Sequence, residues 1–148
     1  MKTVPIIVNP TAGGGRLLRS FSGLDAAAGQ CGVKLDWRHT EYQGHGMELA
    51  REAANEGCPL VLAYGGDGTY NEVGRGLLGS DTSLGILPGG TTSVLAYEFG
   101  IPRPATHALE ALILGRDRAM RVGRTDHDEI FLLMLSSGPD VVGLEHLE

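Results

Sequence analysis

The stretch Leu60-Val61-Leu62-Ala63-Tyr64-Gly65-Gly66-Asp67-Gly68-Thr69 joins a short apolar run to a glycine-rich loop that carries one carboxylate. The apolar run predicts a buried strand over 60–64. The glycines have no Cβ atom and permit positive φ, so consecutive N–H groups of the loop can converge on an anion. Thr69 is expected to open a helix, whose free N–H groups add to the same electropositive spot. This junction therefore predicts an anion site.

The order of strand, glycine loop and helix recurs along the chain. Short apolar or alternating runs predict strands over 4–8, 33–39, 60–64 and 84–87. Amphipathic patterns predict helices from 17 to about 30, and over 47–56, 72–78, 95–99 and 105–114, the fourth capped by Thr91 or Thr92. Strands that alternate with helices form a parallel sheet covered on both faces. We therefore predict an α/β fold, a three-layer Rossmann-like domain with a mainly parallel sheet.

The chain ends on a different pattern. Residues 118–125 and 130–136 predict two strands joined by the turn-forming tripeptide 126–128. We expect this pair to form a hairpin. A chain of 148 residues with 42% hydrophobic composition is enough for one domain of ordinary size.

Charge and composition exclude several kinds of partner. The net charge is -6 and the Lys and Arg residues are scattered, so we expect no nucleic acid partner. No apolar stretch approaches the roughly 20 residues that span a bilayer, and the first residues lack the apolar core of a signal peptide, so a cytoplasmic location is expected. Neither the two cysteines nor the five histidines have the spacing of metal ligands.

Three glycine clusters, at 13–15, 65–68 and 89–90, follow predicted strands. Ligands of parallel sheets bind beyond the carboxyl ends of the strands, so we expect these loops to converge. Together with Arg16 and several hydroxyls they predict a polyphosphate site with room for a cation. Asp67 would repel a bare phosphate, and is therefore interpreted as a ligand of Mg²⁺ or a proton acceptor near a reacting hydroxyl. The alternative is a turn residue bonded to its own backbone.

Other phosphate and hydrolase signatures are absent from the sequence. There is no Walker A lysine, no G-x-G-x-x-G order and no G-x-S-x-G elbow. The acidic residues of 126–129 are interpreted as a solvated turn.

Four segments, in order, resemble the diacylglycerol kinase catalytic-domain family, which includes bacterial lipid kinases and the sphingosine kinases. They are 8–15 (VNPTAGGG), Thr40, 65–73 (GGDGTYNEV) and 84–96 (LGILPGGTTSVLA). NAD kinases and phosphofructokinases carry one similar glycine-aspartate loop, so the resemblance rests on all four together.

The resemblance implies the NAD kinase/diacylglycerol kinase fold and an ATP site with Mg²⁺. It places adenine and ribose near Asn9 and Thr40 and the phosphates along 66–72 and at Thr91. It implies transfer of the γ-phosphoryl of ATP to a lipid hydroxyl, with Asp67 as catalytic and metal-binding residue. The implied nucleotide-binding residues are Asn9, Pro10, Thr11, Ala12, Gly13, Thr40, Gly66, Asp67, Gly68, Thr69, Tyr70, Asn71, Glu72 and Thr91.

Two departures from the family pattern matter. Ser93 stands where the family usually has Asn, and a hydroxyl cannot replace both donor and acceptor of an amide. Family members are also about twice as long, with a second, β-rich domain that carries the general base and the lipid cleft. We therefore expect an ATP-binding domain over 1–130 and the entry to a second domain over 131–148.

The chain is thus expected to be a nucleotide-binding half, inactive alone. A lipid substrate and peripheral membrane contact are implied for the full-length form, and an uncovered apolar face would favour a homodimer. Two alternatives stay open at this point. One is a non-catalytic nucleotide-binding regulatory module, and the other is a kinase acting on NAD, a sugar phosphate or another non-lipid hydroxyl.

Overall fold

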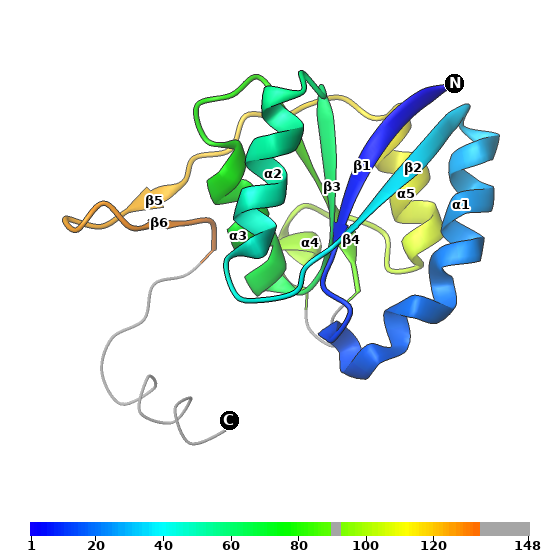
Figure 1. Ribbon diagram of the computed structural model, residues 1–148, viewed down its shortest axis with the longest axis horizontal. Helices are drawn as coiled ribbons and strands as arrows, with labels where there is room; N and C mark the ends of the chain where they lie inside the picture. Colours follow the sequence, from blue (N-terminus) through cyan, green and yellow to red (C-terminus); the bar gives the residue numbers. More distant parts are fainter. Residues whose placement is uncertain (90–92, 134–148) are drawn as a thin grey trace.

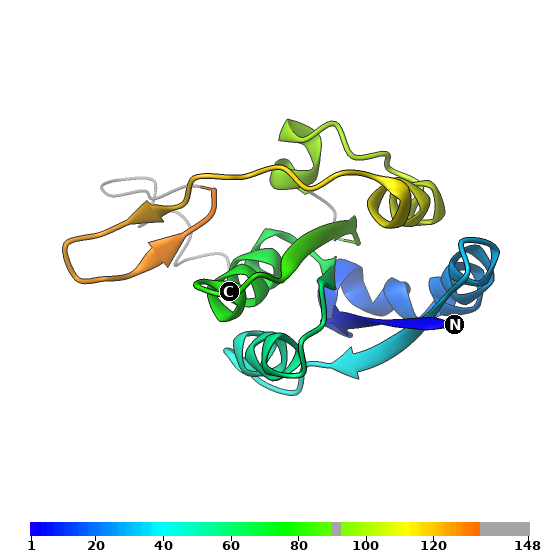
Figure 2. The same cartoon turned by 90° about the horizontal axis from the view of Figure 1, so that it is seen from above.

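The computed structural model describes residues 1–89 and 93–133, and its centre is a four-stranded parallel sheet. The strands, in spatial order, are β2 (Val33–His39), β1 (Lys2–Val8), β3 (Leu60–Gly65) and β4 (Ser83–Pro88). One face is covered by α1 (Phe21–Gln30) and α5 (Ala105–Leu114), the other by α2 (His45–Asn55) and α3 (Asp67–Leu77) (Figures 1 and 2). This arrangement confirms the predicted three-layer α/β fold.

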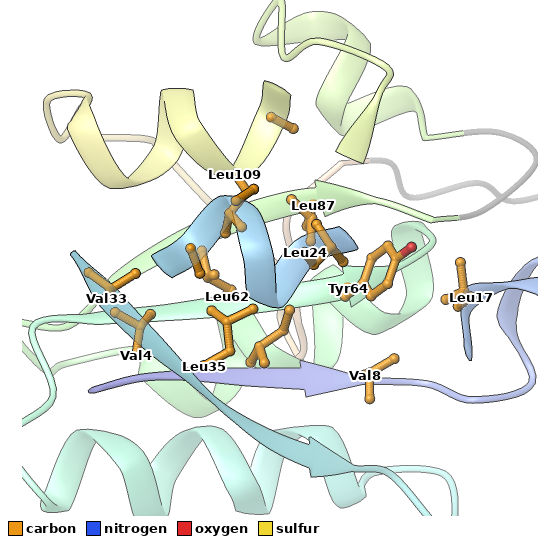
Figure 3. Packing of buried hydrophobic residues seen from close by; sticks show 14 residues of the cluster. Val4, Val8, Leu17, Leu24, Val33, Leu35, Leu62, Tyr64, Leu87 and Leu109 are labelled. Atoms are coloured by element: carbon orange, nitrogen blue, oxygen red, sulfur yellow. The ribbon is translucent and has the colours of Figure 1, made fainter. Parts of the chain in front are cut away.

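Each face of the sheet has its own apolar core, because alternate residues of a strand point to opposite faces. In β3, Leu62 and Tyr64 belong to the core beneath α1 and α5, whereas Val61 and Ala63 belong to the core beneath α2 and α3. Figure 3 shows the first of these cores, with Leu24 of α1 and Leu109 of α5 packed over the sheet. Burial on both faces explains why the strands read as nearly continuous apolar runs.

The strand order has a switch point between β1 and β3. From β1 the chain crosses one face through α1 to reach β2, and from β2 it crosses the other face through α2 to reach β3. The register pairs Val8 with His39 on one side and with Tyr64 on the other. The loops that follow these three strands therefore start side by side. In open α/β sheets, such a crevice is where ligands bind.

The starts of α3 and of α4 (Val94–Glu98) differ from the sequence-based expectation. α3 begins at Asp67 rather than Thr69, because Gly66 is extended and serves as the N-cap. A carboxylate in the first turn interacts favourably with the helix dipole, which supports the earlier start. α4 has Ser93 as its N-cap, and the expected caps Thr91 and Thr92 lie outside the described residues.

The first predicted helix is divided in two. A 3₁₀ segment, η1 (Ala12–Ser20), precedes α1. Gly13, Gly14 and Gly15 inside it have φ of 62°, 68° and 75°. A right-handed helix cannot pass through three left-handed residues, so the regular helix starts only at Phe21.

The predicted hairpin is present but shorter than expected. β5 (Gly123–Arg124) pairs antiparallel with β6 (Ile130–Phe131), where strands over 118–125 and 130–136 were predicted. An isolated two-stranded ribbon is marginal in water, which limits its length. The hairpin lies beside α3, away from α1 and α5 (Figures 1 and 2).

The expected entry to a second domain, 131–148, lies mostly outside the described residues and stays a prediction. Within 1–89 and 93–133, none of the helices has the length and apolar character needed to cross a membrane.

Candidate functional site

A cavity of about 530 Å³ lies at the switch point, beyond the carboxyl ends of three strands. Its size is that of a typical small-molecule site. The residues that line it come from the loops after β1, β2 and β3: Asn9, Thr11, Ala12 and Gly13; Thr40, Glu41, Tyr42 and Gln43; and Gly66, Gly68, Thr69 and Glu72. The first two glycine loops therefore converge as predicted.

The loop after β1 is shaped by one side chain and by glycine. Asn9 Oδ1 accepts hydrogen bonds from the backbone N–H of Thr11 at 3.0 Å and from its hydroxyl at 2.8 Å. Gly13 has a positive φ, and a Cβ atom added there would lie 2.6 Å from the carbonyl oxygen of Gly89. The third glycine loop thus touches the first one at Gly89. Gly90 lies outside the described residues.

The loop after β3 leads directly into the first turn of α3. Gly66, Gly68 and Thr69 all line the cavity. A Cβ atom added at Gly66 or Gly68 would meet no atom within 4 Å, so a ligand can approach the backbone there. The first N–H groups of a helix have no partner inside the helix and attract anions. This end of the cavity therefore suits a phosphate group.

Glu72 lines the cavity and also joins two helices. Its Oε1 accepts a hydrogen bond from the N–H of Gly44 at 2.9 Å, and its Oε2 accepts one from Gly46 at 3.1 Å. Gly44 is the N-cap of α2, so a carboxylate on α3 caps α2. A Cβ atom at Gly46 would lie 2.8 Å from Oε2, so a larger residue there would force the Glu72 carboxylate to shift.

Asp67 caps α4 in the same way as Glu72 caps α2. Its Oδ2 accepts a hydrogen bond from Val94 N–H and its Oδ1 accepts one from Leu95 N–H, both at 3.1 Å. These partners lie on α4, whereas the sequence-based alternative placed them in the residue's own turn. Asp67 lines a smaller cavity of about 190 Å³, with Asn71 and Leu95 among its neighbours. A carboxylate has about four lone-pair positions, so Asp67 retains acceptor capacity.

The side chains present suit Mg²⁺, which can be bound partly by phosphates and waters, better than a metal ion bound only by protein side chains. Over residues 1–89 and 93–133, no three His, Cys, Asp or Glu side chains gather in a way that could hold an ion. Mg²⁺ commonly binds one or two carboxylates together with nucleotide phosphates and waters. Asp67, at the start of α3, is a suitable carboxylate for such a site.

Tyr70 is fully buried behind the glycine loop. Its hydroxyl lies 2.7 Å from the carbonyl oxygen of Gly65, 3.0 Å from that of Leu87 and 3.2 Å from the hydroxyl of Ser93. Tyr70 therefore ties the ends of β3 and β4 to the start of α4. Burial raises the pKa of this phenol to about 12.

This pKa predicts a loss of stability at alkaline pH. The folded chain holds Tyr70 neutral up to about pH 12, whereas in the unfolded chain the phenol ionises near its ordinary value of 10.0. The contribution is complete below pH 10 and is lost as pH rises to about 12, with a total of about 2 to 3 kcal/mol. Urea unfolding at pH 8 and pH 11 should show about half of this loss, and Tyr70→Phe should abolish it.

The exposed Tyr97 supplies the control for this experiment, since its side chain is 82% accessible. Tyr97→Phe should lose stability between pH 8 and pH 11 as the wild type does. An equal alkaline loss in Tyr70→Phe would contradict the assignment.

The predicted site residues lie in five different places. Nine line the larger cavity: Asn9, Thr11, Ala12, Gly13, Thr40, Gly66, Gly68, Thr69 and Glu72. Asp67 and Asn71 line the smaller cavity, Tyr70 is in the core, and Pro10 is in the first loop without lining either cavity. Thr91 lies outside the described residues.

Three further residues, Glu41, Tyr42 and Gln43, line the larger cavity without having been predicted. A signal for them was present, because they follow the carboxyl end of a predicted strand.

Comparisons with known proteins find similar sequences and structures. Residues 3–125 match the sequence model described as the diacylglycerol kinase catalytic domain. The chain is similar to the diacylglycerol kinase of Bacillus subtilis (strain 168), with 35% identity over 129 residues, 85% of this chain and 43% of the relative. It is also similar to a Klebsiella pneumoniae (strain 342) protein named "Probable lipid kinase YegS-like", with 37% identity over 109 residues, 72% of this chain and 37% of the relative.

A solved structure shows the same likeness. The crystal structure of a diacylglycerol kinase from Bacillus anthracis str. Sterne aligns with a TM-score of 0.67 and 30% sequence identity, over 76% of this chain and 42% of that chain. The chain spans less than half the length of the three relatives.

Proposed function

Since this chain belongs to the diacylglycerol kinase catalytic-domain family, we propose that it is the nucleotide-binding part of an ATP-dependent lipid kinase. One observation carries the proposal. The loops after β1, β2 and β3 converge on a single cavity whose one end is formed by glycine backbone and the first turn of α3. Such a surface binds phosphate groups through backbone N–H donors.

The triphosphate of ATP is proposed to lie along Gly66, Gly68 and Thr69. At these positions no side chain beyond that of Thr69 separates a ligand from the backbone. In phosphoryl transfer, negative charge spreads over the equatorial oxygens of the transferred group. Backbone donors that are already oriented stabilise this charge without having to reorganise during the reaction.

Asp67 is proposed to hold Mg²⁺ through the lone pairs that its helix-cap bonds leave free. When bound, Mg²⁺ neutralises charge on the phosphates and helps to align them. The N–H groups of Val94 and Leu95 fix the orientation of the Asp67 carboxylate through their two hydrogen bonds. The carboxylate is thus presented in one direction, as a positioning group requires.

The acceptor is proposed to be the hydroxyl of a lipid such as diacylglycerol, in keeping with the names of the relatives. The hydroxyl oxygen forms a bond to the γ-phosphorus, the bond from that phosphorus to the bridging oxygen breaks, and ADP leaves. The hydroxyl proton passes to a base. This base is expected in the part of the relatives that lies beyond the match with this chain.

A second function, nucleotide binding without transfer, is favoured by one observation. The Asp67 carboxylate already accepts two backbone hydrogen bonds and lines the smaller cavity, as a purely structural cap would. Incubation of the full-length protein with γ-labelled ATP, Mg²⁺ and diacylglycerol in mixed micelles, with NAD in parallel, separates the functions. Labelled lipid supports the kinase, labelled NAD supports the non-lipid alternative, and binding without product supports the regulatory module.

Calorimetric titration with ATP, with and without Mg²⁺, tests the nucleotide site in this chain. Wild type is expected to bind ATP, and Gly66→Ala is expected to weaken binding about tenfold or more, because the methyl group stands between phosphate and backbone. The folded chain accommodates that methyl group, since nothing lies within 4 Å of it. Its unfolding in urea should therefore match wild type.

Gly29→Ala in α1 is the matched control, because its added Cβ atom also meets nothing within 4 Å and Gly29 is not among the cavity residues. It should bind ATP as wild type does. Absence of binding at millimolar ATP, or an unchanged affinity in Gly66→Ala, would overturn the proposed site.

A further inference from the structure

The loop after β2 forms part of the wall of the larger cavity, and it carries an aromatic residue. Tyr42 lines the cavity, and it is the one aromatic side chain among the described residues that do so. Its side chain is 54% exposed, although large aromatic rings usually gain most from burial. A half-exposed ring in a cavity wall is available to a ligand.

The Tyr42 ring is held in a fixed orientation. It stacks on the His45 imidazole, with ring centroids 4.5 Å apart and 7° between the planes. Its hydroxyl donates to Glu48 Oε2 at 2.7 Å, and the N–H of the preceding residue, Glu41, donates to His45 Nδ1 at 3.1 Å. A ring fixed in this way loses little conformational freedom when a ligand stacks on it.

The distribution of charge around the cavity favours one orientation of a bound nucleotide. Glu41 and Glu48 lie beside Tyr42, and the Glu72 carboxylate, which also lines the cavity, is hydrogen-bonded to the start of α2 just after Tyr42. These carboxylates repel phosphate. The loop after β3 has glycine backbone and leads into the first turn of α3, which attract phosphate. The uncharged part of a nucleotide therefore belongs at Tyr42.

We propose that Tyr42 is the stacking surface for the nucleobase and that it favours a purine over a pyrimidine. This inference rests on the proposed function and adds the residue that recognises the base. Stacking on an aromatic ring stabilises any base, and the gain grows with the area of the base, so a purine gains more. Tyr42 is accordingly a specificity-determining residue, whereas the glycine loops bind the phosphates of every nucleotide alike.

The test compares ATP, CTP and inorganic tripolyphosphate by calorimetry at constant Mg²⁺. Tyr42→Ala is expected to weaken ATP binding about tenfold and CTP binding less, and to leave tripolyphosphate binding unchanged. Tyr42→Phe retains the ring and should restore ATP binding to within a few fold of wild type. Tyr97→Ala, at an exposed position outside the cavity, is the matched control and should bind all three ligands as wild type does.

Each other outcome has a definite meaning. Unchanged ATP affinity in Tyr42→Ala, with Gly66→Ala still impaired, overturns this inference and leaves the proposed function standing. Equal losses for ATP and tripolyphosphate also overturn it, because they show that Tyr42 only supports the loop. A wild-type chain that binds neither ATP nor tripolyphosphate overturns the proposed function and this inference together.

Discussion

Asp67→Asn is expected to reduce the Mg²⁺-supported part of ATP binding about tenfold or more, while lowering the free energy of unfolding by only about 1 kcal/mol. The amide keeps one oxygen that can accept from α4, so the cap is weakened rather than lost. It carries no negative charge, and a neutral amide is a poor ligand for Mg²⁺ beside phosphates. Calorimetry with and without Mg²⁺, together with urea unfolding, measures the two effects separately.

Asp67→Ala removes the capping oxygens as well as the charge, so its comparison with Asp67→Asn shows what the cap contributes. It leaves the N–H groups of Val94 and Leu95 without their acceptor, so its stability should fall further, by about 1 to 3 kcal/mol. Asp81→Asn, at an exposed position before the amino end of β4, controls for the change in net charge. Equal Mg²⁺ enhancement in wild type and Asp67→Asn would exclude Asp67 as a cation ligand and support the purely structural cap.

Gly76→Ala is expected to cause the largest loss of stability, about 3 kcal/mol. Its added Cβ atom would lie 2.3 Å from the carbonyl oxygen of Met47 and 2.8 Å from the Cβ atom of Ala50. These atoms belong to α2, so the two helices must separate to admit one methyl group. Urea unfolding should show a clear fall in the midpoint.

Gly29→Ala is the control for Gly76→Ala, because it also replaces a glycine inside a helix by alanine. Alanine is the better helix former, and its methyl group is unobstructed in α1, so this variant should gain up to about 1 kcal/mol. If Gly76→Ala unfolds at the same urea concentration as wild type, then α2 and α3 are not in the close contact described above.

The architecture was largely predictable because it depends on local patterns. The four strands of the sheet were located to within two residues at each end, since burial on both faces leaves a continuous apolar run. The position of the cavity followed from one rule, that ligands bind at the carboxyl ends of parallel strands. The same rule also indicates Tyr42, which follows the carboxyl end of β2 and is not part of a glycine cluster.

The side-chain partners of Asp67 and Glu72 were not predictable. Asp67 meets Val94 and Leu95, and Glu72 meets Gly44 and Gly46, over 26 to 28 positions of sequence. No periodicity connects residues so far apart, because their proximity depends on how whole helices pack. For the same reason the sequence indicated chemistry at Asp67 and gave no sign of its role as a cap.

The two capping carboxylates make the first turns of α3 a junction between α2 and α4. Asp67 and Glu72 are about 140° apart around the helix axis, since each residue advances the helix by about 100°. One carboxylate therefore reaches α4 on one side and the other reaches α2 on the opposite side. A displacement of these turns would therefore displace both α2 and α4. A ligand that shifts the start of α3 would move the two helices together.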